Sequence, residues 1–308
     1  MALPSAAPTV RSHYPRHTFS WFLLILANIL WAASYVAAKF ALRDTSLNIM
    51  LALRMGIAAL ILLPLLIARR RDLRLTRQSL PQFLILALVG FVINKLLEYG
   101  GLALTTASDV ALLIASESIF TAILSWVLLR ERFKPLAGFA LLLGFIGVYL
   151  IVERSFIPNI PSGGGIWRII GDLLVILALL IEAFYTVRGK VLLIKYPPLL
   201  ITAASIVIST LFWMPVAAWE FLSVGWHPLG LMAWLSIGWM ALMSTAIAYL
   251  AWFQGLAKVD GSAAASTLFI QPLLGTILAI MLLHDQLTPM TIIGGILIIA
   301  SVYLISRY

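Results

Sequence analysis

The chain has 308 residues, of which 62% are hydrophobic and only 11% are charged. A soluble domain of this length needs roughly a quarter of its residues charged to cover its surface, so this composition excludes a soluble protein. The mean hydropathy of +1.05 predicts that lipid surrounds most of the side chains. The sequence contains no cysteine, which excludes a disulfide framework and a thiolate metal site.

Residues 1–20 are polar and contain prolines, and we expect them to form a cytoplasmic N-terminal segment. The apolar run 21–42 follows Arg11 and Arg16, as the core of a signal peptide would. At about 22 residues it is longer than the roughly 7–15 residues of such a core. We therefore expect a retained first helix.

Apolar segments of about 20 residues are long enough to cross the hydrocarbon core of a bilayer as helices. The sequence contains ten segments near this length, separated by short polar joints. They are 21–42, 48–67, 81–101, 107–129, 135–152, 171–190, 198–219, 231–253, 262–283 and 289–306. The predicted fold class is therefore an all-α integral membrane protein with ten transmembrane helices.

Lysine and arginine predict the orientation of these helices. If the N-terminus is cytoplasmic, the inside segments hold 15 of the 21 Lys and Arg residues and the outside segments hold 3. The other three, Lys39, Arg54 and Lys95, lie within the spans. Because basic residues gather on the cytoplasmic side, both termini are expected to be cytoplasmic. The same pattern explains the pI near 10 without nucleic acid as a partner.

An internal repeat appears when the sequence is shifted along itself by half its length. Residues 101–103 (GLA) then meet 255–257 (GLA), and residues 148–151 (VYLI) meet 302–305 (VYLI). Glu131 meets Asp285, and Pro135 meets Pro289. The matches predict a first five-helix repeat at 21–152, a periplasmic linker at 153–170 and a second five-helix repeat at 171–308.

A repeat of five helices has a mechanical consequence. Five is an odd number, so the second repeat enters the membrane from the opposite side and is inverted relative to the first. Inverted repeats are the architecture of alternating-access transporters, whose substrate site lies near the bilayer midplane between the halves. We therefore expect a site formed by the first, third, fourth, sixth, eighth and ninth helices.

Several motifs resemble one known family. Residues 28–39 (NILWAASYVAAK), 102–107 (LALTTA) and the turn at 129–132 (LRER) are similar to the first repeat of EamA-type transporters in the drug/metabolite transporter superfamily. Residues 249–257 (YLAWFQGLA) and 271–272 (QP) resemble the second repeat. The resemblance implies a ten-helix inner-membrane exporter of metabolites, most similar to bacterial exporters of aromatic amino acids.

The chain also differs from the family pattern. Ser118 stands in the fourth helix where the family often has a proline, whereas Pro272 is kept in the ninth. In the sixth helix, an acidic Glu182 replaces the aromatic residue expected before Tyr185. These differences leave the identity of the substrate open.

Charged residues within the spans are candidates for function, because a charge at bilayer depth is costly and must face protein or water. Five of them lie in the outer part of the first half: Lys39, Arg54, Lys95, Glu98 and Asp109. Arg54 and Asp109 lie near helix ends, where they could serve a cavity, form ion pairs or extend to the outer interface. Lys95 and Glu98 share a helix face, and we expect them to line a polar, outward-opening cavity.

Glu117 and Glu182 lie about ten residues into their spans, one in each half, and hence near the midplane. Each carboxyl could carry a coupling proton, contact a substrate ammonium group, or form a structural hydrogen bond between helices. Aromatic residues share these spans and could either wall the cavity or pack against neighbouring helices. The complete predicted set of cavity residues is Asn28, Trp31, Tyr35, Lys95, Glu98, Tyr99, Glu117, Glu182, Tyr185, Tyr249, Trp252 and Gln271.

Other functions receive less support from the sequence. Histidines His13, His17, His227 and His284 lie outside the spans without metal-ligand spacing, and no nucleotide-binding motif appears, so we predict no enzymatic activity and no cofactor. Small residues such as Gly147 and Gly294 allow close helix packing, either within the bundle or between the protomers of a homo-oligomer. The predicted partners are thus a small-molecule substrate, such as an amino acid, and membrane lipids. The alternatives are a lipid carrier, a membrane scaffold or an intramembrane enzyme.

Overall fold

The computed structural model describes residues 18–68, 79–102, 104–105, 107–131, 135–153, 165–225, 228–283 and 289–306. The side chains of Tyr35, Lys39 and Asp109 lie outside this description, as do Asp285 and His284. The described residues form α1 (Thr18–Ala41), α2 (Leu47–Ala68), α5 (Ala107–Leu129), α6 (Pro135–Glu153), α7 (Gly165–Leu192), α8 (Pro198–Val224) and α13 (Pro289–Ser306) as single α-helices.

Three further rods change helix type along their length. The first consists of α3 (Leu80–Ala87), the π-helical η2 (Leu88–Ile93) and α4 (Asn94–Leu102). The second consists of α9 (Leu231–Trp239), the π-helical η3 (Met240–Ile247) and α10 (Ala248–Leu256). The third runs through α11 (Gly261–Ala265), the 3₁₀-helical η4 (Ser266–Phe269) and α12 (Ile270–Leu283).

Each apolar segment predicted from the sequence is helical over its described residues. The helix ends differ from the prediction in α7, which begins at Gly165, and in α8, which continues to Val224. The extension of α8 contains neither glycine nor proline, and the helix ends only where Gly225 adopts a φ of 91°. This left-handed conformation suits glycine, which has no Cβ to clash with the backbone.

Five helical segments in the described part of the chain are long and apolar enough to cross a membrane. They are Leu47–Ala68, Leu80–Leu102, Ile166–Leu192, Pro198–Val224 and Leu231–Leu256. Shorter apolar helices occur in four of the other segments, at Thr18–Ser34, Leu113–Leu129, Pro135–Leu150 and Ile292–Leu304. The chain is therefore a multi-pass helical membrane protein, and the full number of ten crossings stays a prediction.

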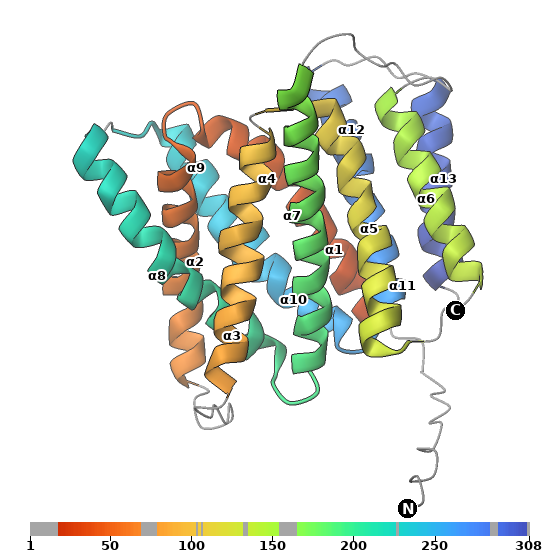
Figure 1. Ribbon diagram of the computed structural model, residues 1–308, viewed down its shortest axis with the longest axis horizontal. Helices are drawn as coiled ribbons and strands as arrows, with labels where there is room; N and C mark the ends of the chain where they lie inside the picture. The colour runs from red at the N-terminus through yellow and green to blue at the C-terminus, as the bar shows by residue number, and fades with distance from the viewer. Residues whose placement is uncertain are drawn as a thin grey trace, which may run out of the picture.

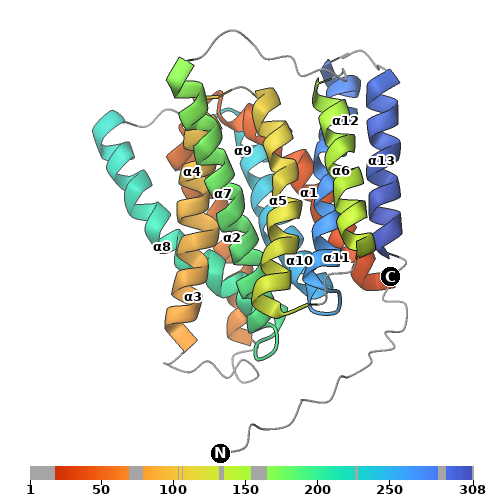
Figure 2. The same cartoon turned by 45° about the vertical axis from the view of Figure 1, so that its right-hand side comes forward.

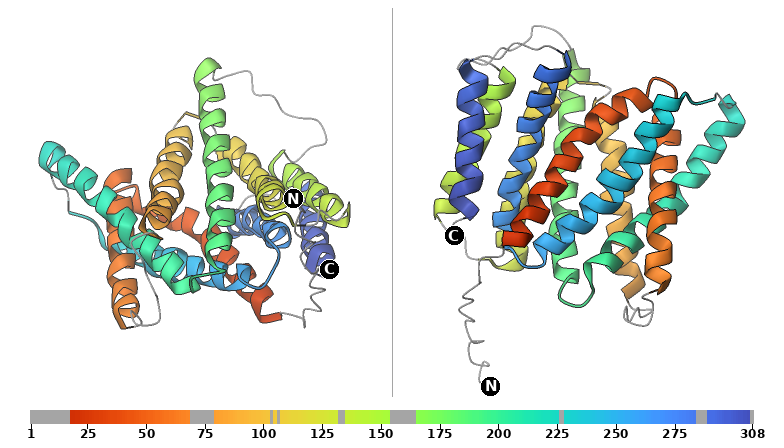
Figure 3. Two further views of the ribbon diagram at one scale, coloured as in Figure 1. Left: turned by 60° about the horizontal axis from the view of Figure 1, so that its bottom comes forward. Right: turned by 180° about the vertical axis from the view of Figure 1, so that it is seen from behind.

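The helices run roughly side by side in one bundle (Figure 1). The α6–α13 pair forms one edge of the bundle, and α8 leans outward at the opposite edge (Figure 2). The first residues of α1 and the last residues of α13 lie at the same end of the bundle (Figure 3). The cytoplasmic location of that end remains a prediction from the basic residues.

The α6–α13 pair reveals how the two halves are related. A Cβ on Gly147 would lie 2.7 Å from the carbonyl oxygen of Gly294, and Ser301 donates a 2.6 Å hydrogen bond to the carbonyl oxygen of Ala140. From the first contact to the second, the residue number falls in α6 and rises in α13, so the two helices are antiparallel. The internal repeat carries Gly147 onto Ser301 and Ala140 onto Gly294. The two contacts are thus exchanged by the repeat, as a two-fold axis between inverted halves requires.

Contacts between the inner helices follow the same symmetry. The packing of α4 on α7 corresponds to the packing of α10 on α1. A Cβ on Gly101 would meet the carbonyl oxygen of Gly171, and a Cβ on its repeat partner Gly255 would meet that of Ser20. Ser20 of α1 therefore corresponds to Gly171 of α7, at a spacing slightly shorter than the one that relates Gly101 to Gly255. The close approach at these glycines holds the two halves together.

Replacement of Gly147 by alanine tests the α6–α13 contact. The added Cβ would overlap backbone of α13, and such overpacking costs about 1–3 kcal/mol. We expect Gly147→Ala to lower the unfolding temperature of the purified protein in detergent. Gly100→Ala is the matched control, because a Cβ at Gly100 would meet nothing within 4 Å. Equal unfolding temperatures for the two variants would contradict the close contact.

Candidate functional site

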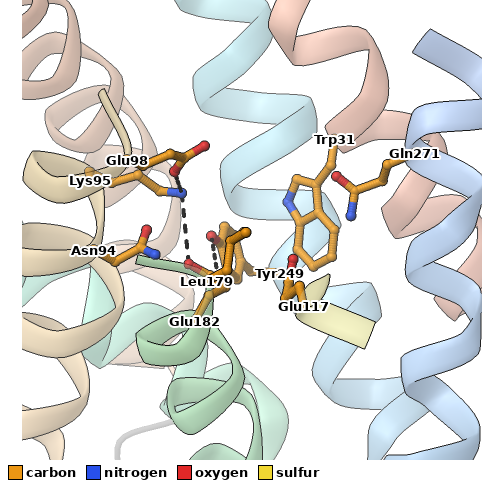
Figure 4. Close-up of a pocket in the computed structure, with 9 residues that line it drawn as sticks. All are labelled: Trp31, Asn94, Lys95, Glu98, Glu117, Leu179, Glu182, Tyr249 and Gln271. Atoms are coloured by element: carbon orange, nitrogen blue, oxygen red, sulfur yellow. Dashed lines mark hydrogen bonds and ion pairs between the residues drawn. The ribbon is translucent and has the colours of Figure 1, made fainter. Parts of the chain in front are cut away.

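A small cavity of about 60 Å³ lies where the helices of the two halves meet. Residues from α1, α4, α5, α7, α10 and α12 line it (Figure 4). They are Trp31, Asn94, Lys95, Glu98, Glu117, Leu179, Glu182, Tyr249 and Gln271. In the close-up, Asn94, Lys95 and Glu98 lie on one side and Trp31 and Gln271 on the other. Polar and ionisable side chains thus gather inside the bundle, away from lipid.

The two π-helical segments place side chains at the cavity. Asn94 and Lys95 directly follow η2, and Tyr249 lies just beyond η3. A π-helical turn contains more residues than an α-helical turn, so it rotates the residues that follow it about the helix axis. The two segments occupy equivalent positions in the two repeats and aim α4 and α10 toward the same cavity.

Charged groups form a connected cluster on one side of the cavity. The Lys95 ammonium lies 2.7 Å from a carboxylate oxygen of Glu98 and 3.8 Å from one of Glu182. The Tyr249 hydroxyl donates a 3.3 Å hydrogen bond to the other Glu182 oxygen. Glu117 is buried at the cavity wall, and no hydrogen bond or ion pair joins its carboxyl group to another described residue.

The other side of the cavity carries an amide and aromatic rings. Gln271 donates a 3.0 Å hydrogen bond to Asn28, which in turn donates to Thr267 at 3.0 Å. The Trp31 indole nitrogen donates to the carbonyl oxygen of Ser244 at 3.0 Å. The Trp31 ring lies 5.0 Å from that of Tyr249 between centroids, which is an edge-on aromatic contact. These contacts fix the orientation of the side chains on this side of the cavity.

The lining residues are related in pairs by the two-fold axis. The internal repeat carries Lys95 onto Tyr249 and Glu117 onto Gln271. Helices α1 and α7 correspond at the slightly shorter spacing that also relates Ser20 to Gly171. At this spacing Trp31 corresponds to Glu182. In each of these pairs one member is ionisable at neutral pH and the other is an aromatic or amide residue. The cavity therefore lies on the pseudo-two-fold axis, with chemically different walls.

Seven of the predicted cavity residues line the cavity: Trp31, Lys95, Glu98, Glu117, Glu182, Tyr249 and Gln271. Asn28 lies behind the wall and holds Gln271. Tyr185 and Trp252 are buried and pack against Tyr249 and Trp31, respectively, so they support the wall without lining it. Tyr99 interacts with Arg54 outside the lining set. The Tyr35 side chain lies outside the described residues.

Two residues of the cavity lining escaped the sequence analysis. Asn94 and Leu179 line the cavity. Leu179 is the partner of Asn28 only at the shorter spacing that relates α1 to α7 in the structure, whereas a shift by half the chain length pairs Asn28 with Glu182, so the internal repeat contained no signal for Leu179. Arg54 was expected to serve a cavity or to extend to the interface, and the interface alternative is wrong. Its side chain is 5% exposed and donates to Thr245 at 2.6 Å and to Ser244 at 3.3 Å. Arg54 is held inside the bundle because the hydroxyl groups of η3 face it.

A polar cluster closes one end of the cavity helices. Glu131, in the turn after α5, accepts hydrogen bonds from the backbone N–H groups of Gly261 at 2.8 Å and Ser262 at 3.1 Å. Lys190 of α7 donates to Glu131 at 2.8 Å and to the carbonyl oxygen of Val259 at 2.7 Å. The turn of the first half is thereby tied to two elements of the second half.

Electrostatics favour the charged form of Glu131. Burial alone would raise the pKa of this carboxyl group. The Lys190 ammonium and the N–H groups of Gly261 and Ser262 outweigh burial and hold the pKa below its usual value. Glu131 therefore stays ionised at neutral pH and completes the ion pair.

The volume of the cavity shows that the protein is contracted around it. Ligand pockets usually measure about 300–1,000 Å³, whereas this cavity can hold only a few water molecules. A small molecule can enter only when the helices around the cavity move apart. The cluster at Glu131 is one of the contacts that such a movement at this end must break.

The EamA-like transporter family matches residues 18–153 and again residues 169–307. The chain belongs to this family. The two matches follow the inverted repeats and include all the cavity residues.

Relatives cover nearly the whole chain. An uncharacterized transporter of Archaeoglobus fulgidus is 28% identical over 282 residues, which are 92% of this chain and 95% of that protein. An S-adenosylmethionine/S-adenosylhomocysteine transporter of Chlamydia trachomatis is 30% identical over 136 residues, 44% of this chain and 42% of that protein. A solved crystal structure aligns with a TM-score of 0.77 at 17% identity and covers 94% of this chain and 96% of the other. These likenesses support a small-molecule transporter with this fold.

Removal of the Glu131 carboxylate tests the closing cluster. Glu131→Gln loses a charge-assisted interaction, which contributes about 1–3 kcal/mol, so we expect a lower unfolding temperature in detergent at pH 7. Because the pKa of Glu131 is lowered in the folded state, this contribution is present above the usual carboxyl pKa. It is lost as the pH falls through the lowered value.

The difference between wild type and Glu131→Gln should therefore disappear at strongly acidic pH. Lys195→Gln removes an exposed lysine near the same end and serves as the control. A Glu131→Gln variant as stable as wild type at pH 7 would argue against the cluster.

Proposed function

We propose that the chain is a secondary transporter that exports small metabolites across the inner membrane by alternating access. The favoured substrates are amino acids, above all aromatic ones. The observation that carries the proposal is the cavity on the pseudo-two-fold axis, lined by repeat-related residues of both halves. A site on this axis can be approached from either end by the same relative movement of the halves, which is the principle of alternating access.

Several features support an amino-acid-like substrate. The cavity combines carboxylates, an ammonium group and an amide with the rings of Trp31 and Tyr249. The carboxyl groups can pair with the ammonium group of an amino acid, and the rings can stack on an aromatic side chain. The named substrate of the Chlamydia trachomatis relative is itself an amino-acid derivative with a heteroaromatic ring. The excess of basic residues in the predicted cytoplasmic segments supports the proposed orientation.

Glu117 and Glu182 have central roles in the proposal. Each carboxyl can bind the substrate ammonium, carry a coupling proton, or do both at different steps of the cycle. Transport coupled to protons would make flux depend on a pH gradient. Facilitated diffusion would not.

Flux into and out of proteoliposomes tests the proposal. A panel of labelled amino acids, measured with and without a pH gradient, should include at least one substrate, with aromatic amino acids transported fastest. We expect Glu117→Gln and Glu182→Gln to reduce flux at least about ten-fold while expression and unfolding temperature stay close to wild type.

Glu220→Gln provides the matched control, since Glu220 binds Asn48 at the end of α8, away from the cavity. Its flux should equal that of wild type. Full flux in both cavity variants, or no flux of any compound in the wild-type protein, would refute the proposal.

A further inference from the structure

The hydrogen-bonding groups around the cavity are unevenly used. Nitrogen donors of the lining residues already bind the protein. Asn94 donates to the carbonyl oxygen of Ala178 at 2.9 Å, Gln271 donates to Asn28, and Trp31 donates to Ser244. The Lys95 ammonium faces Glu98 and Glu182. A substrate therefore finds few free donors in this cavity.

Acceptors, in contrast, remain available. The side-chain oxygen of Asn94 is buried without a hydrogen-bond partner, and so is the Glu182 oxygen that faces Lys95 at 3.8 Å. Asn94 is only 1% exposed, and its amide orientation is set because its nitrogen must donate to Ala178. An acceptor left unpaired inside a protein is unfavourable. Two buried acceptors at one cavity are satisfied together by a ligand that donates several hydrogen bonds.

Charge points to the same kind of ligand. Three carboxyl groups and one ammonium group line the cavity. The Lys95 ammonium is shared between Glu98 at 2.7 Å and Glu182 at 3.8 Å, and no cation pairs with Glu117 among the described residues. Arg54 does not line the cavity and binds the hydroxyl groups of Ser244 and Thr245. The lining therefore holds more carboxyl groups than cations, which favours a ligand that brings a positive charge.

Aromatic rings complete the site beside these acceptors. Tyr249 hydrogen-bonds Glu182 with its hydroxyl group and contacts Trp31 with its ring. Trp31 in turn lies against Trp252 with ring centroids 5.4 Å apart. The rings therefore offer a flat apolar surface next to the carboxyl groups. This arrangement suits a ligand whose aromatic ring lies close to its positive charge.

We propose that the cavity selects small aromatic amines with a net positive charge. The ammonium group lies among Asn94, Glu117 and Glu182, and the ring lies against Trp31 and Tyr249. This inference rests on the proposed transport function. It ranks the aromatic amines by charge: compounds whose carboxylate is absent or blocked bind more tightly than the zwitterionic amino acids, because both carboxyl groups nearest Lys95 already engage its ammonium group.

Three compounds that share one aromatic ring but differ in net charge test the selection. Phenylalaninamide is a cation, phenylalanine is a zwitterion, and phenyllactate is an anion without an amine. Their binding to the full-length protein in detergent is measured by isothermal titration calorimetry near pH 6, where the amines are protonated. Phenylalaninamide should bind at least about ten-fold more tightly than phenylalanine, the effect of one charge-assisted hydrogen bond. Phenyllactate should show no binding.

Variants of the acceptors make the test specific. Glu117→Gln and Glu182→Gln should each weaken the binding of phenylalaninamide at least about ten-fold and leave the small affinity for phenylalanine less affected. Glu220→Gln should bind phenylalaninamide like wild type. Unfolding temperatures of all variants identify any loss that arises from misfolding. In that case Glu117→Asp, which keeps the charge, should retain the preference for the cation.

Failure of this inference differs from failure of the proposed function. Binding of phenylalanine as tight as that of its amide, binding of phenyllactate, or no binding of any of the three compounds would overturn the selection for cations. Export of amino acids from proteoliposomes would still support transport in each of these cases. Absence of flux for every compound would refute the proposed function, whatever the calorimetry shows.

Discussion

Charged side chains are costly inside a bilayer, and this constraint governs how the protein is built. Lys95, Glu98, Glu117 and Glu182 come from three different helices, yet all face one cavity, where they are kept away from lipid. The outer surfaces of these helices are apolar and can contact lipid. A single polar centre thus requires helices of both halves to converge, and their convergence determines the packing of the remaining helices. The need to shield these charges from lipid therefore helps to determine the architecture.

The inverted repeat supplies the geometry for this convergence. Contacts such as Gly147 with Gly294 and Ser301 with Ala140 are exchanged by the two-fold axis, so one packing solution is used twice. Within this symmetric frame the cavity residues have diverged. The repeat pairs Lys95 with Tyr249 and Glu117 with Gln271, so one scaffold presents both ionisable groups and aromatic or amide groups to the cavity. A symmetric movement of helices can then act on a substrate that binds in one orientation.

Much of this arrangement could be predicted from the sequence, because apolar length and repeat spacing are properties of the chain alone. They located the helical segments and seven of the twelve predicted cavity residues. Which side of each helix faces the cavity could not be predicted as well. The π-helical turns of η2 and η3 rotate α4 and α10, and η3 is held by contacts to Arg54 from a distant helix. Trp252 of α10 consequently points into packed surroundings, Tyr185 of α7 is buried beside Tyr249, and Arg54 is buried although the sequence had left extension to the interface open.

The most direct test of alternating access measures distances at both ends of the bundle. Because the chain has no cysteine, spin labels can be attached to cysteines introduced in pairs. Arg130 and Lys258 mark the end closed by Glu131, and Leu42 and Ile166 mark the ends of α1 and α7 on the opposite side; all four are exposed. Alternating access predicts that, when a transported compound is added in proteoliposomes, one distance increases while the other decreases. Two distances that stay constant, or change in the same direction, would contradict it.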